Sequence, residues 1–209
     1  MNLGAERYHY KTTQNSTRLL ANVFWASADF RVQTGVVLIH PKQERVFMVY
    51  NKRLDMTTLP RGKSGDIDAL LGSPAESVQA MCGHQCTLLP LPKLVKEYTE
   101  PEHEAIARIE DERSVDPFYI TFDTLWVDTP TERWSQGYQL ITFWYAAYVD
   151  GDISPNSTTR LDPSARWVPL QDVSAALKGD DFGSKIFGVF TQLWDYLKTP
   201  AEQRQTVLK

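Results

Sequence analysis

Residues 59–89 read LPRGKSGDIDALLGSPAESVQAMCGHQCTLL, and this stretch decides the fold of the 209-residue chain. Its centre, SPAE at 73–76, predicts the start of a helix. Serine is a favoured N-cap, proline suits the first helical position, and a glutamate three residues after the cap completes a capping box. Further side chains recur at helical spacing and are expected to face the core: Val78, Met81, Cys82 and Gln85. The pattern predicts a strand, an LPRGK loop and a helix that begins at Pro74.

The same stretch has no acidic residue between Ser77 and Lys96. The order of strand, LPRGK loop and capped helix resembles the Nudix hydrolases, whose signature carries a glycine, an isolated glutamate, an Arg-Glu pair and a Glu-Glu pair. Carboxylates one helical turn apart lie on one face, where they hold hard divalent cations against a substrate diphosphate. The resemblance implies a metal-dependent hydrolase, and the acid-free stretch argues against that activity in this chain.

On the Nudix helix, Gln79 and Ala80 stand at the Arg-Glu pair, while Gly83 and His84 stand at the Glu-Glu pair. Every acidic position of this degenerate Nudix box is vacant, and a shift of one or two residues restores none of them. We therefore expect no metal ligands here and no cofactor. Mg²⁺ or Mn²⁺ would be needed only if a residual hydrolase used relocated carboxylates.

Three acids remain in the segment, namely Asp66, Asp68 and Glu76. Asp68 could stand at the isolated glutamate of the family, although the distance from Gly62 to Gln79 is then three residues longer than the usual spacing. Glu76 is better explained as the capping-box carboxylate. A solvated loop and a helix cap are therefore the favoured interpretation of these acids.

Other segments extend the resemblance. Residues 34–40 and 45–50 are similar to the paired first strands of the Nudix sheet, and residues 139–149 to an aromatic-rich central strand. Residues 165–173 are similar to the ending of the family, a strand with tryptophan that runs into a short helix. In this order they predict an α/β protein of Nudix fold, with a mixed β-sheet sandwiched between helices.

The parts of the chain follow from these segments. We expect an N-terminal extension (1–33) that packs on the domain, a Nudix-like domain (34–198) with an acidic insertion (97–116), and a tail (199–209). The insertion is expected to hold a short helix at 101–112 with a buried stripe, Ala105, Ile106 and Ile109. A core-packing helix is predicted at 182–197, with Asp180 or Asp181 near its N-terminus, where negative charge is favoured.

Composition narrows the class of protein. Hydrophobic residues at 42% and aromatic residues at 11% indicate a folded core. With 22 basic and 26 acidic residues, a formal charge of −4 gives no global field toward nucleic acid or an anionic membrane. We find no span-length apolar stretch and no signal core at the start, so a soluble, cytoplasmic protein is expected.

The two cysteines, Cys82 and Cys86, lie four residues apart on the predicted helix. A helical turn does not readily give disulfide geometry, and a metal would need two further soft ligands. Buried or half-buried free thiols are the expected state.

Basic residues gather around the LPRGK loop and could bind an anionic ligand: Lys52, Arg53, Arg61 and Lys63, with Gly62 permitting close backbone approach. A merely solvated set of charges is an equal alternative. Aromatic side chains could line a ligand pocket or belong to the core: Tyr50, Trp126, Trp134 and Trp144. Candidates for proton transfer are His84, Asp66, Asp68, Glu102, His103 and Glu104.

Three functions are left open. The leading one is a Nudix-fold protein that has lost metal-dependent pyrophosphohydrolysis and uses the cleft to bind a phosphorylated or aromatic small molecule or a partner protein. The second is a repurposed enzyme that carries out metal-independent acid-base chemistry, such as isomerisation or cyclisation. The third is a residual hydrolase of a nucleoside-diphosphate-linked substrate. A small-molecule ligand is the expected partner, a homodimer is left open, and no membrane or strong nucleic-acid signal is present.

Overall fold

The computed structural model describes residues 30–51, 55–62, 73–97, 106–126, 137–149, 165–200 and 203–204. This part of the chain contains a seven-stranded sheet with the order β3-β2-β1-β8-β4, in which β7 also pairs with β8 and β9 with β2. The strands are β1 (Phe30–His40), β2 (Arg45–Asn51), β3 (Met56–Thr58), β4 (Cys86–Leu88), β7 (Tyr119–Trp126), β8 (Gly137–Val149) and β9 (Ala165–Pro169). Strands β5 (Leu91–Glu97) and β6 (Ile106–Ser114) form a separate antiparallel pair.

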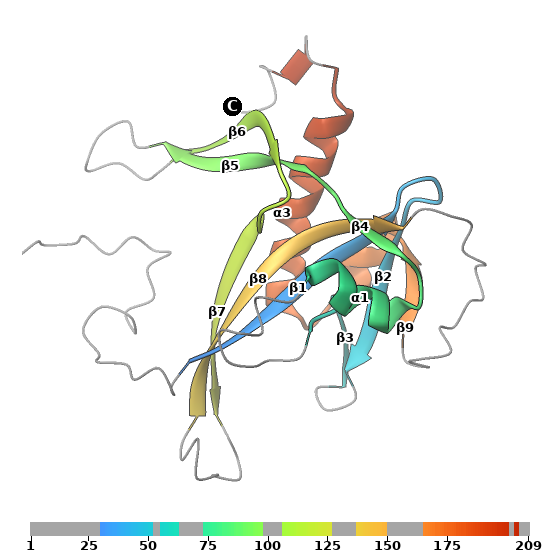
Figure 1. Cartoon of the computed structure of the whole chain (residues 1–209), viewed down its shortest axis with the longest axis vertical. Coiled ribbons are helices and arrows are strands. Elements are labelled where there is room, and N and C mark those ends of the chain that lie inside the picture. Colours follow the sequence, from blue (N-terminus) through green and yellow to red (C-terminus); the bar gives the residue numbers. More distant parts are fainter. Residues whose placement is uncertain are drawn as a thin grey trace, which may run out of the picture.

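Helices cover both faces of the large sheet (Figure 1). They are α1 (Pro74–Cys82), α2 (Val173–Ala176) and α3 (Asp181–Lys198), and a 3₁₀ turn, η4 (Leu170–Asp172), precedes α2. Strands β1 and β8 run parallel while the other pairs are antiparallel, so the sheet is mixed. The α/β class and the mixed sheet between helices, predicted from the sequence, are confirmed.

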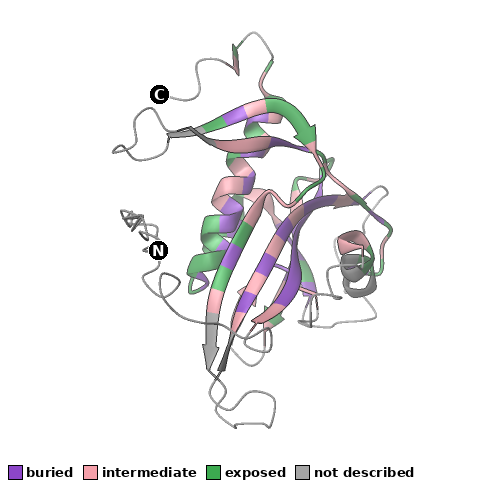
Figure 2. Cartoon of the chain, turned by 60° about the vertical axis from the view of Figure 1, so that its left-hand side comes forward, coloured by how far each residue is buried: buried purple, intermediate pink, exposed green. Residues whose placement is uncertain are grey.

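The central strand β1 is buried on both faces, as its continuous apolar run predicts. Residues Val32 to His40 of β1 are all buried, while buried and intermediate residues alternate along most of β8 (Figure 2). Alternate side chains go to opposite faces. Val37 and Trp144 pack in one core cluster with Phe190 of α3, whereas Val36 packs in a second cluster with Cys82 of α1. We call these two sides of the sheet the α3 face and the α1 face.

The segment from β3 to Gly62 lies between β1 and β2 where these two strands diverge. Those strands pair at two positions next to their turn and then diverge. Strand β3 pairs with the far end of β2, and the chain then reaches β1. There the Val36 N–H donates to the Pro60 carbonyl at 3.0 Å, and the Gly62 N–H donates to the Thr34 carbonyl at 2.7 Å. The loop is therefore anchored to the central strand by its backbone.

The first strand begins earlier than expected. The sequence indicated a strand over 34–40, but β1 starts at Phe30, and its residues 30–33 pair in parallel with residues 139–142 of β8. These four residues, assigned to the N-terminal extension, thus belong to the sheet. Residues 1–29 lie outside the described residues.

The helix predicted at 101–112 is wrong over its described part, since residues 106–114 form strand β6. The spacing of Ile106 and Ile109 fits a helix, but β5 supplies backbone partners on both sides of a register shift at Pro92 and Lys93. Ile109 is buried opposite Leu94, and Lys93 pairs with Glu112 across the strands at 2.6 Å. Non-local pairing therefore overrides a local helical pattern.

The predicted C-terminal elements are confirmed. Strand β9 carries the buried Trp167 and runs through η4 into α2. Helix α3 spans Asp181 to Lys198, and the carboxylate of its N-cap, Asp180, accepts a hydrogen bond from the Gly183 N–H at 2.8 Å. Its buried residues are Gly183, Ile186, Phe187, Phe190, Leu193 and Tyr196.

Candidate functional site

Helix α1 begins at Pro74 with Ser73 as its N-cap, as predicted. The capping box is not formed, because the Ser73 side chain makes no cap hydrogen bond. Glu76 is exposed in the first turn, where its negative charge interacts favourably with the helix dipole. The predicted start of the helix is therefore right, and the predicted side-chain capping is wrong.

The end of α1 decides where the residues that the sequence analysis aligned with a Nudix box lie. Gly83 is the C-cap in a left-handed conformation (φ 70°, ψ 9°), and its N–H donates to the Gln79 carbonyl at 2.8 Å. Gln79 is exposed on the helix, whereas Gly83 and His84 lie beyond it. A glycine at this position avoids the steric cost of a Cβ in the left-handed region. Gly83 and His84 thus do not extend the helical face of α1.

Two expectations about this helix are corrected by the same cap. Gln85 was expected to face the core, but it lies outside the helix and is exposed. Cys86 was placed on the helix, but it opens β4. Cys82 and Cys86 are free and buried, as expected. Ala80 lies within α1, and its side chain lies outside the described residues.

The guanidinium of Arg61, the best-described of the predicted ligand-binding residues, packs on the α3 face. Its Cζ lies 5.3 Å from the centre of the Trp144 ring, and Nη2 lies 3.4 Å from Oδ2 of Asp180. Beneath the ring is Gly35, where an added Cβ would come within 2.4 Å of Trp144. We call Gly35, Trp144, Arg61 and Asp180 the Arg61 stack. Trp144 is only 1% exposed, so it belongs to the core and not to a ligand pocket.

The Arg61 stack and helix α1 lie on opposite faces of the sheet. Trp144 shares a core cluster with α3, and Cys82 shares the other cluster with residues of β1, β2 and β8. The Arg61 side chain is therefore not aimed at α1. Gly62 is half-buried and bonded to β1, and the other basic candidates, Lys52, Arg53 and Lys63, lie outside the described residues.

A half-buried acid that the sequence did not single out stands near this stack. Burial raises the pKa of Asp123 on β7, the Arg61 charge opposes that rise, and the Asp180 charge adds to it. On the same strand, the Thr121 hydroxyl accepts a hydrogen bond from Nε1 of Trp144 at 3.1 Å. Asp123 comes close to Arg61 only through the pairing of β7 with β8, so no local spacing in the sequence marks it.

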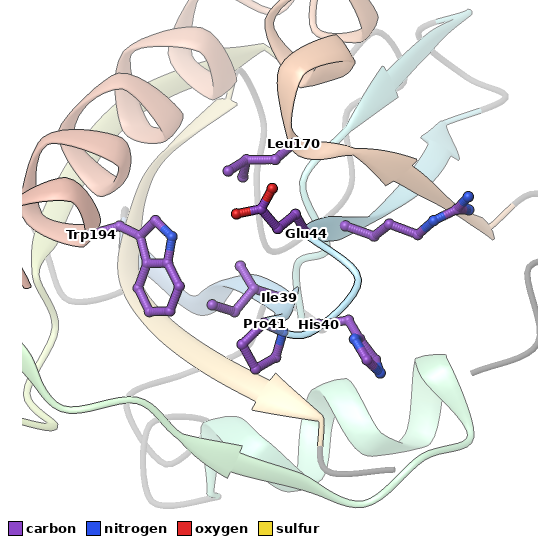
Figure 3. Close-up of a pocket in the computed structure, with 7 residues that line it drawn as sticks. Ile39, His40, Pro41, Glu44, Leu170 and Trp194 are labelled. Carbon is purple, nitrogen blue, oxygen red and sulfur yellow. The ribbon is translucent and has the colours of Figure 1, made fainter. Parts of the chain in front are cut away.

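A small cavity lies at the turn between β1 and β2 (Figure 3). Its volume is about 10 Å³, which is room for about one water molecule. It is lined by Ile39, His40, Pro41, Glu44, Arg45, Leu170 and Trp194, and by none of the site residues predicted from the sequence. Lys198 lies over Trp194 and pairs with Glu44 at 3.3 Å, so this region ties α3 to the turn.

Within the described ranges, no group of three or more His, Cys, Asp or Glu side chains is arranged to hold a metal ion. No helix of that part of the chain is both long enough and apolar enough to cross a membrane. Five of the proton-transfer candidates lie outside the described residues: Asp66, Asp68, Glu102, His103 and Glu104. The sixth, His84, is half-buried in the turn after α1, and the roles of all six stay predictions.

No protein-family model matches this chain, and no curated protein sequence matches it. Among solved structures, the Ap4A hydrolase of C. elegans is similar at 8% identity, with 78% of this chain and 96% of that chain covered and a TM-score of 0.40.

A NUDIX family hydrolase from Clostridium perfringens is similar at 17% identity, over 81% of this chain and 98% of that chain, with a TM-score of 0.35. The NUDIX domain of Shewanella oneidensis NrtR, complexed with ADP ribose, is similar at 18% identity, over 70% and 76% of the two chains, with a TM-score of 0.28. Similarity at this level concerns the arrangement of strands and helices and not the chemistry.

Proposed function

We propose that this chain is a Nudix-fold protein that has lost metal-dependent pyrophosphohydrolysis and binds a phosphorylated or aromatic small molecule, or a partner, in the ancestral cleft. The observation that carries the proposal is the end of α1. The helix has no carboxylate after Glu76 and ends at Cys82, with Gly83 in the left-handed cap. The positions that would hold the metals therefore lack both the ligand oxygens and a continuous helical face.

The Arg61 stack limits how the ligand is held. Asp180 already accepts from Arg61, and Asp123 adds a second negative charge nearby when it is ionised. A bound anion would gain little electrostatic energy from Arg61, because the nearby carboxylates already balance its charge. In our proposal the phosphate is bound instead by Lys63, Lys52 and Arg53, and Gly62 contributes only close backbone approach, because its N–H already donates to the Thr34 carbonyl.

Calorimetric titration tests the binding half of the proposal. The protein is titrated with a nonhydrolysable nucleoside diphosphate derivative, with and without Mg²⁺ or Mn²⁺. We expect binding whose affinity is unchanged by the metal, and an affinity at least about fivefold lower in Lys63→Ala, which corresponds to about 1 kcal/mol. Arg61→Ala that retains its fold should bind almost as wild type does. Affinity that requires the metal, or that falls more in Arg61→Ala than in Lys63→Ala, contradicts the proposal.

One observation favours the alternative of metal-independent acid-base chemistry. Asp123 is a half-buried carboxyl with a raised pKa beside a cation, which is an arrangement that active sites use for proton transfer. An isomerisation of this kind exchanges a substrate C–H proton with solvent. Incubation of carbonyl-containing sugar phosphates with the protein in D₂O, followed by NMR, would detect that exchange. Deuterium incorporation that is lost in Asp123→Asn would support the enzyme, and its absence across the panel would reject it for this class of substrate.

A further inference from the structure

The two thiols of the chain face each other across the turn that closes α1. The Sγ atoms of Cys82 and Cys86 are 3.4 Å apart, and both residues are buried, at 0% and 8% exposed. A disulfide has an S–S distance of about 2.05 Å, so the sulfurs must approach by about 1.4 Å to bond. A movement of this size lies within the reach of side-chain rotation and small backbone adjustment.

The turn between the thiols places them in this way. Gly83 takes the left-handed cap conformation, which turns the chain out of α1 and directly into β4. Cys86 then pairs with Val149 of β8, while Cys82 packs in the core of the α1 face. The sequence pattern suggested one helix for both cysteines, and that arrangement would have kept the thiols one turn apart. The observed turn joins a helix end to a strand start and brings the sulfurs into contact.

The hydrogen bonds around the pair distinguish the two sulfurs. The His84 N–H donates to Sγ of Cys82 at 3.4 Å, and the Cys86 thiol contributes a further contact. The hydrogen bond between the two thiols lowers the pKa of Cys82 to about 7 and, together with burial, raises the pKa of Cys86. Of the two sulfurs, Cys82 is therefore the one that more readily becomes the thiolate, which is the nucleophilic form.

The residues between the two thiols are accessible to solvent. Gly83 and Gln85 are exposed and His84 is half-buried, while the two cysteines themselves are buried. Hydrogen peroxide is close to water in size and can reach such a site through a local opening of the turn.

We propose that Cys82 and Cys86 form a reversible intramolecular disulfide, with Cys82 oxidised first by hydrogen peroxide and Cys86 acting as the resolving thiol. This bond would link the last residue of α1 to the first residue of β4 and hold the turn that carries Gly83 and His84. It is a modification site that does not depend on the proposed loss of hydrolase activity.

The chemistry balances in two steps. The Cys82 thiolate attacks one oxygen of hydrogen peroxide, which breaks the O–O bond, gives the sulfenic acid and releases hydroxide. Hydroxide takes up the proton that Cys82 lost to solvent. The Cys86 sulfur then attacks the Cys82 sulfur, and the sulfenic hydroxyl leaves with the Cys86 proton as water. In total, two thiols and one peroxide give one disulfide and two waters, and a dithiol reductant reverses the change.

Intact mass spectrometry of the full chain tests the proposal. Reduced protein is treated with hydrogen peroxide, denatured and alkylated. We expect a monomer that has lost two hydrogens and takes up no alkyl group, and that takes up two after reduction with dithiothreitol, since the chain has only two cysteines. Two alkyl groups after peroxide treatment, or a disulfide-linked dimer on a non-reducing gel, would overturn the proposal.

Two serine variants test the order of the steps, after circular dichroism has confirmed that each is folded. Cys86→Ser should stop at the sulfenic acid, which dimedone traps as an adduct on Cys82. Cys82→Ser should react with peroxide severalfold more slowly than Cys86→Ser near pH 7, because Cys86 stays buried, which raises its pKa, and lacks the hydrogen bond that the His84 N–H donates to Cys82. Equal rates in the two variants would overturn the assignment of Cys82 as the first thiol. The wild-type mass result stands even if either variant fails to fold.

Discussion

The beginning and the end of the segment 59–89 pack on opposite faces of the large sheet. The first half delivers Arg61 to the α3 face, where it covers Trp144 and pairs with the N-cap of α3. The second half forms α1 and the cysteine turn on the α1 face. Arg61 and helix α1, although they are close in sequence, therefore do not combine their side chains into one site. The position of a basic side chain such as Arg61 in the folded chain must therefore be known before the side chain is assigned to ligand binding.

The largest change in the free energy of unfolding is expected at Gly35, where the Arg61 stack leaves no room for a side chain. Gly35→Ala would place a Cβ within 2.4 Å of the buried Trp144 ring, and the surrounding core cannot yield without moving that ring. We expect a loss of about 3 kcal/mol in the free energy of unfolding, measured with denaturant. The matched control is Gly188→Ala in α3, which meets nothing within 4 Å and should gain about 0.5 to 1 kcal/mol through helix propensity. Similar free energies of unfolding for the two variants would show that the absence of a side chain at Gly35 is not needed for the packing of Trp144.

The next effect separates a packing role of Arg61 from a ligand role. Arg61→Ala removes the contact with Trp144 and leaves the buried Asp180 without its cation. The guanidinium is partly exposed, so we expect a loss of about 2 kcal/mol in the free energy of unfolding and not the full cost of a broken interior pair. Lys185→Ala, at an exposed position of α3, serves as the comparison and should leave stability within about 0.5 kcal/mol. An Arg61→Ala protein as stable as wild type would remove the packing role that we assign.

A smaller effect is expected on the α1 face. Gly83→Ala forces a Cβ into the left-handed region at φ 70° and should lower the free energy of unfolding by about 1 kcal/mol. Gln85→Ala, an exposed substitution two residues further in the same turn, should change it by less than about 0.5 kcal/mol. If Gly83→Ala were neutral, the turn would have another conformation in solution, and the contact between the two thiols would lose its structural basis.

The smallest predicted effect is one of pH dependence. The pKa of Asp123 is raised above its ordinary value of 3.8, so the folded state binds this proton more tightly than the unfolded state does. Wild-type stability should therefore fall relative to Asp123→Asn as pH rises from about 4 through the raised pKa. Thermal unfolding of both proteins across this range measures the difference. A wild-type protein that gains stability over Asp123→Asn with rising pH would contradict the sign of the shift.

Local patterns were enough to predict strands β1, β2, β8 and β9 and both main helices, but not β4 or β7. The apolar runs at 34–40 and 139–149 predict buried strands, and the apolar spacing at 182–197 predicts the packing face of α3. The hairpin of β5 and β6 could not be predicted in this way, because the spacing of Ile106 and Ile109 fits a helix equally well. The choice between the two depends on backbone partners far along the chain.

The candidate site was harder to predict for the same reason. Arg61 and Asp180 are 119 residues apart, and the sheet alone brings Gly35 under Trp144. No spacing rule connects such positions. One signal was present in the sequence and was not used: a glycine directly after Cys82 is typical of a helix C-cap, and it predicts that Cys86 lies outside the helix.

Our central proposal is that this chain has lost metal-dependent pyrophosphohydrolysis, and a phosphate-release assay tests it most directly. Wild type and Asp68→Asn are incubated with nucleoside-diphosphate-linked compounds and dinucleoside polyphosphates, in the presence of Mg²⁺ or Mn²⁺, with a coupled phosphatase to reveal cleaved products. We predict no turnover above the protein-free rate for either protein. Metal-dependent turnover by wild type that is abolished in Asp68→Asn would contradict the account and assign catalysis to relocated carboxylates.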